Sequence, residues 1–266
     1  MESDPHAWIA ALRNSHERLA SLVRPLTAEQ VRGPSYCSDW TIAQVLSHLG
    51  SGAQVSLMTL PVTLGEAEPL GGEALRPVWD IWNAKSPDDQ ARDCLIVDER
   101  HVVTLEQLSD ADLARIRFPF IGLELDAAGL IRLRLGEHAM HTWDVAVSAD
   151  PAATVAPDAV TLLVDTVPEF IAPRLGKPQA EEFRNRIVTT SPDRDYLLTV
   201  TETVSMTGWP WKGQEAATEL GLPELRMPAE ALLRLSYGRL DPEHTPADVA
   251  ADPADLDRLR KVFPGF

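Results

Sequence analysis

The stretch from Leu130 to Val147 limits most strongly what this chain can fold into. Apolar residues dominate it at helical spacing, which predicts a buried helix, and such a helix normally keeps ionisable groups off its inner face. Glu137 and His141 nevertheless lie four residues apart within it, with Asp144 three residues further on. At about 3.6 residues per turn these side chains share one helix face. A carboxylate and an imidazole placed in this way supply half of a metal site in a helical bundle.

His138 is the rival ligand in the same stretch, because it is adjacent to Glu137. Its side chain points about 100° round the helix from Glu137, so we do not expect it to share a cation with Glu137 and His141. We expect His138 to pack or to hydrogen-bond against a neighbouring helix instead. Two roles stay open for Asp144: it accepts the proton of an imidazole and so orients the ring, or it pairs with a nearby arginine.

The first half of the chain predicts about four long amphipathic helices, and helices in this number form a bundle whose interior can hold metal ligands. A loop rich in Gly, Pro and Glu is expected at residues 65–77. The long helices are expected near residues 5–24, 42–53, 88–108 and 126–147, and a further helical segment is expected to begin at 79–84.

His48 lies at the edge of the apolar stripe of the second of these helices. From the local pattern alone, a histidine at such an edge is more often packed or hydrogen-bonded than a ligand. Trp40 and Trp143 are expected to anchor the core. Cys37 is either a reactive thiol near the site or, as we favour, a small buried residue.

A boundary is expected near residues 150–157, where Ala, Pro, Asp and Thr replace the apolar periodicity. One more helix is predicted at 158–171. Segments 186–190 and 196–204 are rich in β-branched residues and flank a turn sequence, which predicts a β-hairpin. Helices following Pro228 and Asp252 complete a small α+β domain.

The composition excludes several partners. The chain has 266 residues, which favours two domains, and a formal net charge of -16. Such acidity repels phosphate backbones and anionic lipid, so no nucleic acid and no membrane partner is expected. No basic and apolar leader and no run of roughly 18 apolar residues is visible, and the two cysteines form no disulfide framework. We expect a cytoplasmic protein.

Three stretches together resemble one family: S-D-W-T-I-A-Q-V-L-S-H-L at 38–49, R-L-G-E-H-A-M-H-T-W-D-V-A at 134–146, and the ending at 228–240 with 252–254 and 263–266. The chain resembles the mycothiol-dependent maleylpyruvate isomerase family of actinobacteria over nearly its whole length. The resemblance implies an α + (α+β) fold. A DinB-like four-helix bundle that binds metal would occupy residues 1–150, and a small α+β domain similar to sterol carrier proteins would occupy residues 156–266.

The resemblance also implies the ligand set. The D-W-T…H-L motif carries a family ligand onto His48, and the E-x-x-x-H motif carries two more onto Glu137 and His141. Three protein ligands leave an open position on the cation, for which zinc (Zn2+) is the default and another divalent metal the alternative. The family's functional arginine would fall on Arg239, where it could hold a substrate carboxylate.

The implied chemistry needs a thiolate, and neither ligand motif contains a cysteine. The nucleophile would therefore come from mycothiol, deprotonated on the metal. Addition of the thiolate to a small electrophilic substrate gives an isomerase if the adduct eliminates after bond rotation, and a transferase if it is retained. We expect such an enzyme, as a monomer or homodimer.

Two other functions stay open. The chain could be a metal-dependent hydrolase that activates water at the open position. It could also be a non-catalytic protein that binds metal or a small molecule. The sequence leaves the electrophile and the metal undecided, because members of one fold family differ in substrate.

Overall fold

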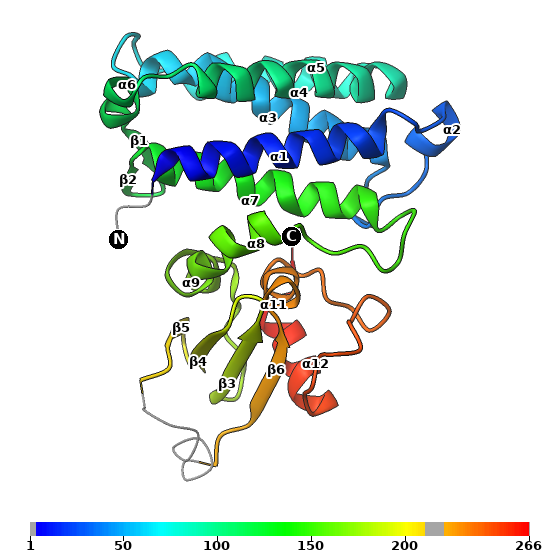
Figure 1. Cartoon of the computed structure of the whole chain (residues 1–266), viewed down its shortest axis with the longest axis vertical. Coiled ribbons are helices and arrows are strands. Elements are labelled where there is room, and N and C mark those ends of the chain that lie inside the picture. The colour runs from blue at the N-terminus through cyan, green and yellow to red at the C-terminus, as the bar shows by residue number, and fades with distance from the viewer. Residues whose placement is uncertain (1–3, 211–220, 266) are drawn as a thin grey trace. The chain divides into compact units, whose positions relative to one another are not determined.

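A computed structural model describes residues 4–210 and 221–265 of the chain. They form two compact units, of which the first ends at Ala153 and the second begins at Thr154 (Figure 1). The first unit is helical and the second combines a sheet with helices, so the predicted fold class, α + (α+β), is confirmed. No helix in the described part of the chain is both long enough and apolar enough to cross a membrane.

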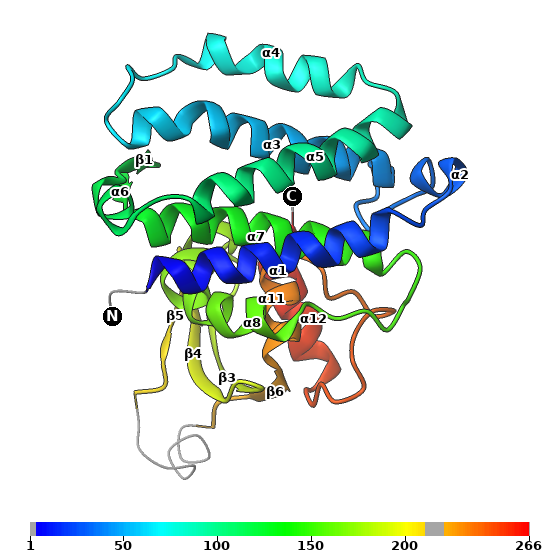
Figure 2. The same cartoon turned by 45° about the horizontal axis from the view of Figure 1, so that its top comes forward.

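The first unit is built on four long helices. Helix α1 lies along α7, and α5 lies along α3, as Figures 1 and 2 show. Helix α4 packs on α3 from outside this group (Figure 2). The bounds of these helices are α1 Pro5–Val23, α3 Ile42–Thr63, α4 Gly72–Asn83, α5 Pro87–Glu106 and α7 Ala127–Ala146. Short elements complete the unit: α2 Ala28–Val31, α6 Asp110–Arg115, and an antiparallel hairpin of β1 Phe118–Phe120 and β2 Leu123–Leu125.

The starts of α3 and α7 are fixed by side-chain caps. At the start of α3, the Gln44 amide N–H donates to Thr41 Oγ1 at 3.2 Å, and the Thr41 amide N–H donates to Gln44 Oε1 at 2.8 Å. At the start of α7, the Gly129 amide N–H donates to Asp126 Oδ1 at 2.8 Å. Such caps satisfy amide groups that have no partner within the helix. They therefore determine which residues of α3 and α7 face each other further along.

The interior of the bundle is apolar and closely packed around α3. Val45, Leu46 and Leu49 are fully buried, as is the indole of Trp82 on α4 apart from 1% of its surface. Gly50 permits this approach, because a Cβ at this position would lie 2.3 Å from the Trp82 ring. The α3–α4 contact therefore depends on a residue without a side chain.

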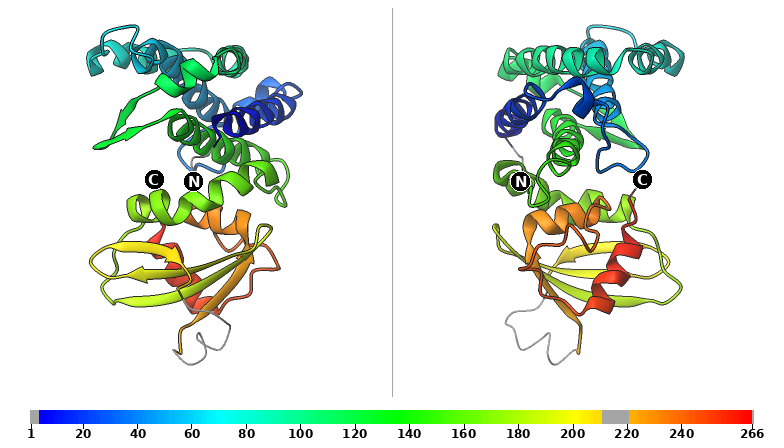
Figure 3. Two further views of the ribbon diagram at one scale, coloured as in Figure 1. Left: turned by 60° about the vertical axis from the view of Figure 1, so that its left-hand side comes forward. Right: turned by 90° about the vertical axis from the view of Figure 1, so that its right-hand side faces the viewer.

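The second unit contains a four-stranded sheet in the order β5-β4-β3-β6. β3 (Phe183–Thr190) and β4 (Arg194–Val200) are antiparallel, as the hairpin prediction required. β5 (Val204–Gly208) pairs with β4 in the antiparallel sense, and β6 (Glu224–Pro228) pairs with β3 in parallel. Helix α11 (Ala229–Ser236) contacts β3 and β6, and α8 (Pro157–Leu163) contacts α11 (Figure 3). In the described part of this unit, the other α-helices are α9 Ala172–Leu175 and α12 Pro253–Val262.

Three local predictions are wrong. The loop expected at 65–77 ends at Gly71, because Val78 and Trp82 are four residues apart and bury one face of α4. The helix expected at 158–171 stops as an α-helix at Leu163 and continues as 3-10 and π turns, where Pro168 lacks an amide donor. The strand expected at 196–204 is split by a bend between β4 and β5.

Candidate metal centre

The three predicted ligands come together between α3 and α7. His48 Nε2 lies 3.1 Å from Glu137 Oε2, and His141 Nε2 lies 3.6 Å from the same oxygen. The centroids of the two imidazole rings are 4.8 Å apart, with 69° between the ring planes. Two ring nitrogens on facing helices therefore surround one carboxylate oxygen.

This donor set fits a small divalent cation. Bonds of about 2.0–2.1 Å in tetrahedral geometry place neighbouring ligand atoms roughly 3.3 Å apart. The two distances from Glu137 Oε2, 3.1 Å to His48 and 3.6 Å to His141, lie on either side of that value. Two imidazoles and one carboxylate suit zinc and similar metals better than calcium or magnesium. Three protein ligands would leave a coordination position open for another molecule.

Asp144 determines which nitrogen of His141 faces Glu137. His141 Nδ1 lies 2.8 Å from Asp144 Oδ2, and the Asp144 side chain is completely buried. The Cys37 thiol donates to the same oxygen at 3.2 Å. The carboxylate thus keeps the proton on Nδ1 and leaves the Nε2 lone pair for a cation. Of the two roles left open for Asp144, orienting an imidazole is the one that the structure shows.

The pKa of His141 is raised to about 10 in this setting. Burial alone lowers the pKa of the ring, but interactions with Asp144, Cys37 and Glu137 outweigh that effect. The pKa of Glu137 is lowered far below its usual range: partial burial raises it, and interactions with His141 and His48 lower it by more. Without a cation, the site is an ion pair, so a cation that binds His141 Nε2 must displace a proton.

The three side chains were expected to meet in the interior of the bundle. They meet at its edge instead. The His48 side chain is 39% exposed and that of Glu137 is 47% exposed, whereas His141 is buried. The reason is the position of His48 at the border of the apolar stripe of α3, whose centre packs against other helices. A cation held by these three side chains would therefore be accessible to a small molecule.

Trp40 is not the core anchor that the sequence suggested. Its side chain is 37% exposed, and its ring centroid lies 5.3 Å from that of His48 and 6.1 Å from that of His141. Trp143, in contrast, is buried as predicted, and its indole donates to the Ala153 carbonyl at 2.8 Å. Trp40 thus forms an aromatic wall beside the two ligand rings.

His138 lies away from the candidate metal centre, whereas Cys37 lies beside it. His138 is fully buried and hydrogen-bonds with Ser15 of α1 and Asp98 of α5, which confirms that it turns away from Glu137. Cys37 is half-buried, packs partly against the apolar core and donates to Asp144. It therefore combines a packing role with a contact at the site.

Arg239 belongs to the second unit, just beyond α11. Its side chain is largely buried, and one guanidinium N–H donates to the Tyr237 carbonyl at 2.9 Å. Its amide N–H donates to the Arg234 carbonyl at 2.6 Å. The role of Arg239 in substrate binding stays a prediction.

Among the buried ionisable residues that the sequence patterns did not single out are His16 and Asp98. His16 of α1 and Asp98 of α5 are hydrogen-bonded to each other at 2.8 Å inside the bundle. A signal for His16 was present: it falls between Leu12 and Leu19 at helical spacing, in the apolar stripe of α1.

Comparison with known proteins adds a family and a fold. The family model described as the mycothiol maleylpyruvate isomerase N-terminal domain matches residues 12–146. A protein of Geobacillus thermodenitrificans (strain NG80-2) named "Putative metal-dependent hydrolase" is 28% identical over 123 residues, which are 44% of this chain and 67% of that protein.

Two solved structures resemble the whole chain. The crystal structure of the mycothiol-dependent maleylpyruvate isomerase matches with a TM-score of 0.65 and 14% identity over 94% of each chain. The structure of a point mutant of the mycothiol-dependent maleylpyruvate isomerase matches with a TM-score of 0.63 and 14% identity over 90% of each chain. At this level of identity, the likeness shows a shared fold.

Proposed function

Because the chain belongs to the mycothiol maleylpyruvate isomerase family, whose N-terminal domain model it matches over residues 12–146, we propose that it is a metal-dependent enzyme that uses mycothiol. It acts on a small electrophilic substrate as an isomerase or an S-transferase. The observation that carries the proposal is the convergence of His48, Glu137 and His141 on one point at an accessible edge. The donor set favours zinc among divalent metals.

The side chains have distinct tasks in this proposal. His48 and His141 would hold the cation through Nε2, and Glu137 would hold it through Oε2. When bound, the cation lowers the pKa of a thiol that reaches its open position, so that the sulfur reacts as a thiolate near neutral pH. Asp144 keeps the proton of His141 on Nδ1, which keeps Nε2 free and correctly aimed.

The two cysteines of the chain support an external thiol. Cys94 is completely buried, and burial raises the pKa of its thiol. The Cys37 thiol is engaged with the Asp144 carboxylate. Neither is free to act as the nucleophile, so the sulfur comes from a second molecule.

The reaction needs no further reagent. The thiolate adds to an electrophilic carbon of a conjugated double bond, and a proton is taken up at the neighbouring carbon. Loss of that proton and expulsion of the same thiolate after bond rotation give the isomer. Retention of the carbon–sulfur bond gives the S-transfer product. Trp40 lines one side of the ligand rings and restricts the directions from which substrate approaches.

A second candidate is a metal-dependent hydrolase, favoured by the 28% identity with the Geobacillus protein of that name. The same open position would then bind water, whose pKa a divalent metal also lowers. Esters or amides would be cleaved without any thiol.

The test compares thiol-dependent with thiol-independent turnover. Zinc-loaded protein is supplied with small α,β-unsaturated acids and mycothiol, and with esters and no thiol. Our proposal predicts product only when mycothiol is present, and loss of activity in the His48→Ala/Glu137→Gln variant. Ester cleavage without thiol would establish the hydrolase, and zinc-loaded protein inactive in both assays would contradict both candidates.

A further inference from the structure

A second group of ligating side chains lies inside the bundle, on a different face of α7 from the candidate metal centre. It consists of His16 of α1, Asp98 of α5 and His138 of α7, all buried. Asp98 Oδ2 lies 2.8 Å from His16 Nδ1 and 2.8 Å from His138 Nε2. Two imidazole nitrogens therefore converge on one carboxylate oxygen, as they do at the first centre.

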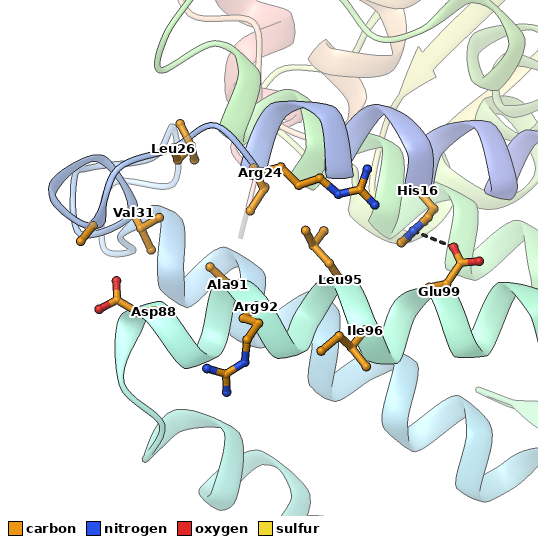
Figure 4. A pocket seen from close by; sticks show the side chains of 12 residues that line it. His16, Arg24, Leu26, Val31, Asp88, Ala91, Arg92, Leu95, Ile96 and Glu99 are labelled. Carbon is orange, nitrogen blue, oxygen red and sulfur yellow. Dashed lines mark ion pairs between the residues drawn. The ribbon is translucent and has the colours of Figure 1, made fainter.

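The outer nitrogen of each imidazole has a partner of its own. His16 Nε2 lies 2.9 Å from Glu99 Oε2, and Figure 4 shows this pair. His138 Nδ1 lies 2.8 Å from Ser15 Oγ. Histidines that bind metals almost always donate their second ring N–H to a carboxylate, carbonyl or water. Glu99 meets that requirement for His16, and the Ser15 hydroxyl offers an oxygen acceptor to His138.

Asp98 is supported in the same manner. Its second oxygen, Oδ1, accepts a hydrogen bond from the Arg134 guanidinium at 2.7 Å, while Oδ2 faces the two histidines. The carboxylate is completely buried, and its pKa is well below the usual range: burial raises it, and the charges of His138 and Arg134 lower it by more. Asp98 thus carries a full negative charge inside the bundle.

His16 has a carboxylate beside each ring nitrogen: Asp98 Oδ2 lies 2.8 Å from Nδ1, and Glu99 Oε2 lies 2.9 Å from Nε2. A cation held between Nδ1 and Asp98 would leave Nε2 facing Glu99. The outer contact of a metal-bound histidine is therefore already in place.

His101 supplies an independent observation. It follows Asp98 by three residues on α5, the spacing at which bundle helices present a carboxylate and an imidazole to a shared cation. Its side chain is buried, and Nδ1 has no hydrogen-bond partner in the described structure. Burial lowers its pKa to about 3, so the ring is neutral and Nδ1 or Nε2 offers a lone pair.

A groove leads from solvent to His16, whereas Asp98 and His138 do not line it. A cavity of about 640 Å³ lies between α1, α2 and α5, with His16 and Glu99 at one end and Val31 and Asp88 at the other (Figure 4). An entry path of this kind is required of any buried metal site.

We propose that His16, Asp98 and His138 form a second site for a divalent transition metal, buried in the bundle, which joins α1, α5 and α7. Nitrogen and carboxylate donors favour zinc, cobalt or iron over magnesium and calcium. Because all three side chains are buried, the site is structural: it stabilises the bundle and takes no part in turnover. The proposal is independent of the function of the first centre.

The test uses a variant that lacks the first centre. His48→Ala/Glu137→Gln removes two partly exposed ligands and should leave the fold intact, as far-ultraviolet circular dichroism would verify. After cobalt loading and gel filtration, we expect about one equivalent of metal by mass spectrometry and a higher Tm than for the metal-free form. When His138→Gln, or separately His16→Gln, is added to this variant, the protein should lose both the bound equivalent of cobalt and the rise in Tm.

A matched control is Ser47→Ala, which removes a buried hydroxyl that bonds Asn83 elsewhere in the same bundle. It should keep the cobalt equivalent. A folded His48→Ala/Glu137→Gln protein that retains no cobalt would overturn the proposal. The proposal would also be overturned if the variants with added His138→Gln and His16→Gln retained as much cobalt as the protein without these substitutions. If either added substitution unfolds the chain, an anomalous scattering map of cobalt-loaded His48→Ala/Glu137→Gln crystals decides by the presence or absence of a peak among the three side chains.

Discussion

Asp144 Oδ2 lies 2.8 Å from Nδ1 of His141, and this one contact determines how the ring meets a cation. The carboxylate is completely buried, so it hydrogen-bonds to groups of the protein and not to bulk water. It holds a proton on Nδ1 and directs the Nε2 lone pair toward Glu137, 3.6 Å away. The affinity of the proposed centre for a cation would therefore depend on a residue that does not itself bind the cation.

Asp144→Asn should lower zinc affinity about 10–100-fold, the usual cost of losing an outer partner of a ligating histidine. The amide no longer carries the charge that favours a proton on Nδ1. Competition with a chromophoric chelator measures the affinity. Asp150→Asn, an exposed position just beyond α7, is the control and should bind zinc normally. Equal affinity of the Asp144→Asn and unmodified proteins would show that the contact does not orient the ring.

Zinc binding should release about one proton near neutral pH. The pKa of His141 is raised from 6.5 to about 10, so the metal-free ring is protonated and must lose its proton to bind. Affinity should therefore rise with pH until about pH 10. Calorimetry in two buffers with different ionisation enthalpies counts the protons. Zinc binding at pH 7.5 without proton release would contradict the assigned charge of His141.

The same shift predicts how pH affects the metal-free protein. A folded-state pKa raised above the unfolded value stabilises the fold fully below the unfolded pKa, and this stabilisation declines as pH rises through the folded pKa. The free energy of unfolding of the metal-free protein should thus fall between pH 6.5 and about pH 10. Urea titrations across this range measure it. The free energy of unfolding should decline less in His141→Gln, which lacks the titrating group. An identical decline in this variant would mean that other residues cause it.

Trp40 should report on metal binding by fluorescence. Its ring centroid lies within 6.1 Å of both ligand imidazoles, so cobalt at the centre should quench its emission. Although the chain has seven tryptophans, Trp40→Phe should remove most of the cobalt-dependent loss of fluorescence. Trp79→Phe, at another exposed tryptophan, should leave that loss unchanged. Equal quenching in both variants would mean that cobalt binds away from Trp40.

Gly50→Ala should destabilise the bundle by about 1–3 kcal/mol, the range for overpacking a closed core. Alanine is the better helix former by about 1 kcal/mol, but its Cβ would lie 2.3 Å from the buried Trp82 ring, which donates to Gln54 at 2.6 Å and is held in place. Urea unfolding measures the change. Gly71→Ala, where an added Cβ meets nothing within 4 Å, is the control. Unchanged stability would show that Trp82 can move aside.

The sequence was sufficient for the features that depend on helical periodicity. The spacing of Glu137 and His141, and the separation of His138 from them, follow from one turn of helix, and the structure agrees. Their role as ligands stays a prediction. The resemblance to the family, and not the local pattern, singled out His48.

What the sequence missed depends on contacts between distant segments. His16 and Asp98 are 82 residues apart, so nothing local connects them. The exposure of Trp40 follows from where α3 meets α7, which no single helix encodes. Helix α4 forms despite Pro77, because burial of Val78 and Trp82 against the bundle outweighs the lost hydrogen bond.

In our proposal, the first metal centre binds the sulfur of an external thiol. Titration of mycothiol into cobalt-loaded protein, followed in the near-ultraviolet spectrum, tests this binding. We predict a new sulfur-to-cobalt charge-transfer band that saturates at one equivalent of mycothiol. The band should be absent with S-methylated mycothiol and in the His48→Ala/Glu137→Gln variant. A cobalt spectrum that mycothiol leaves unchanged would contradict the account.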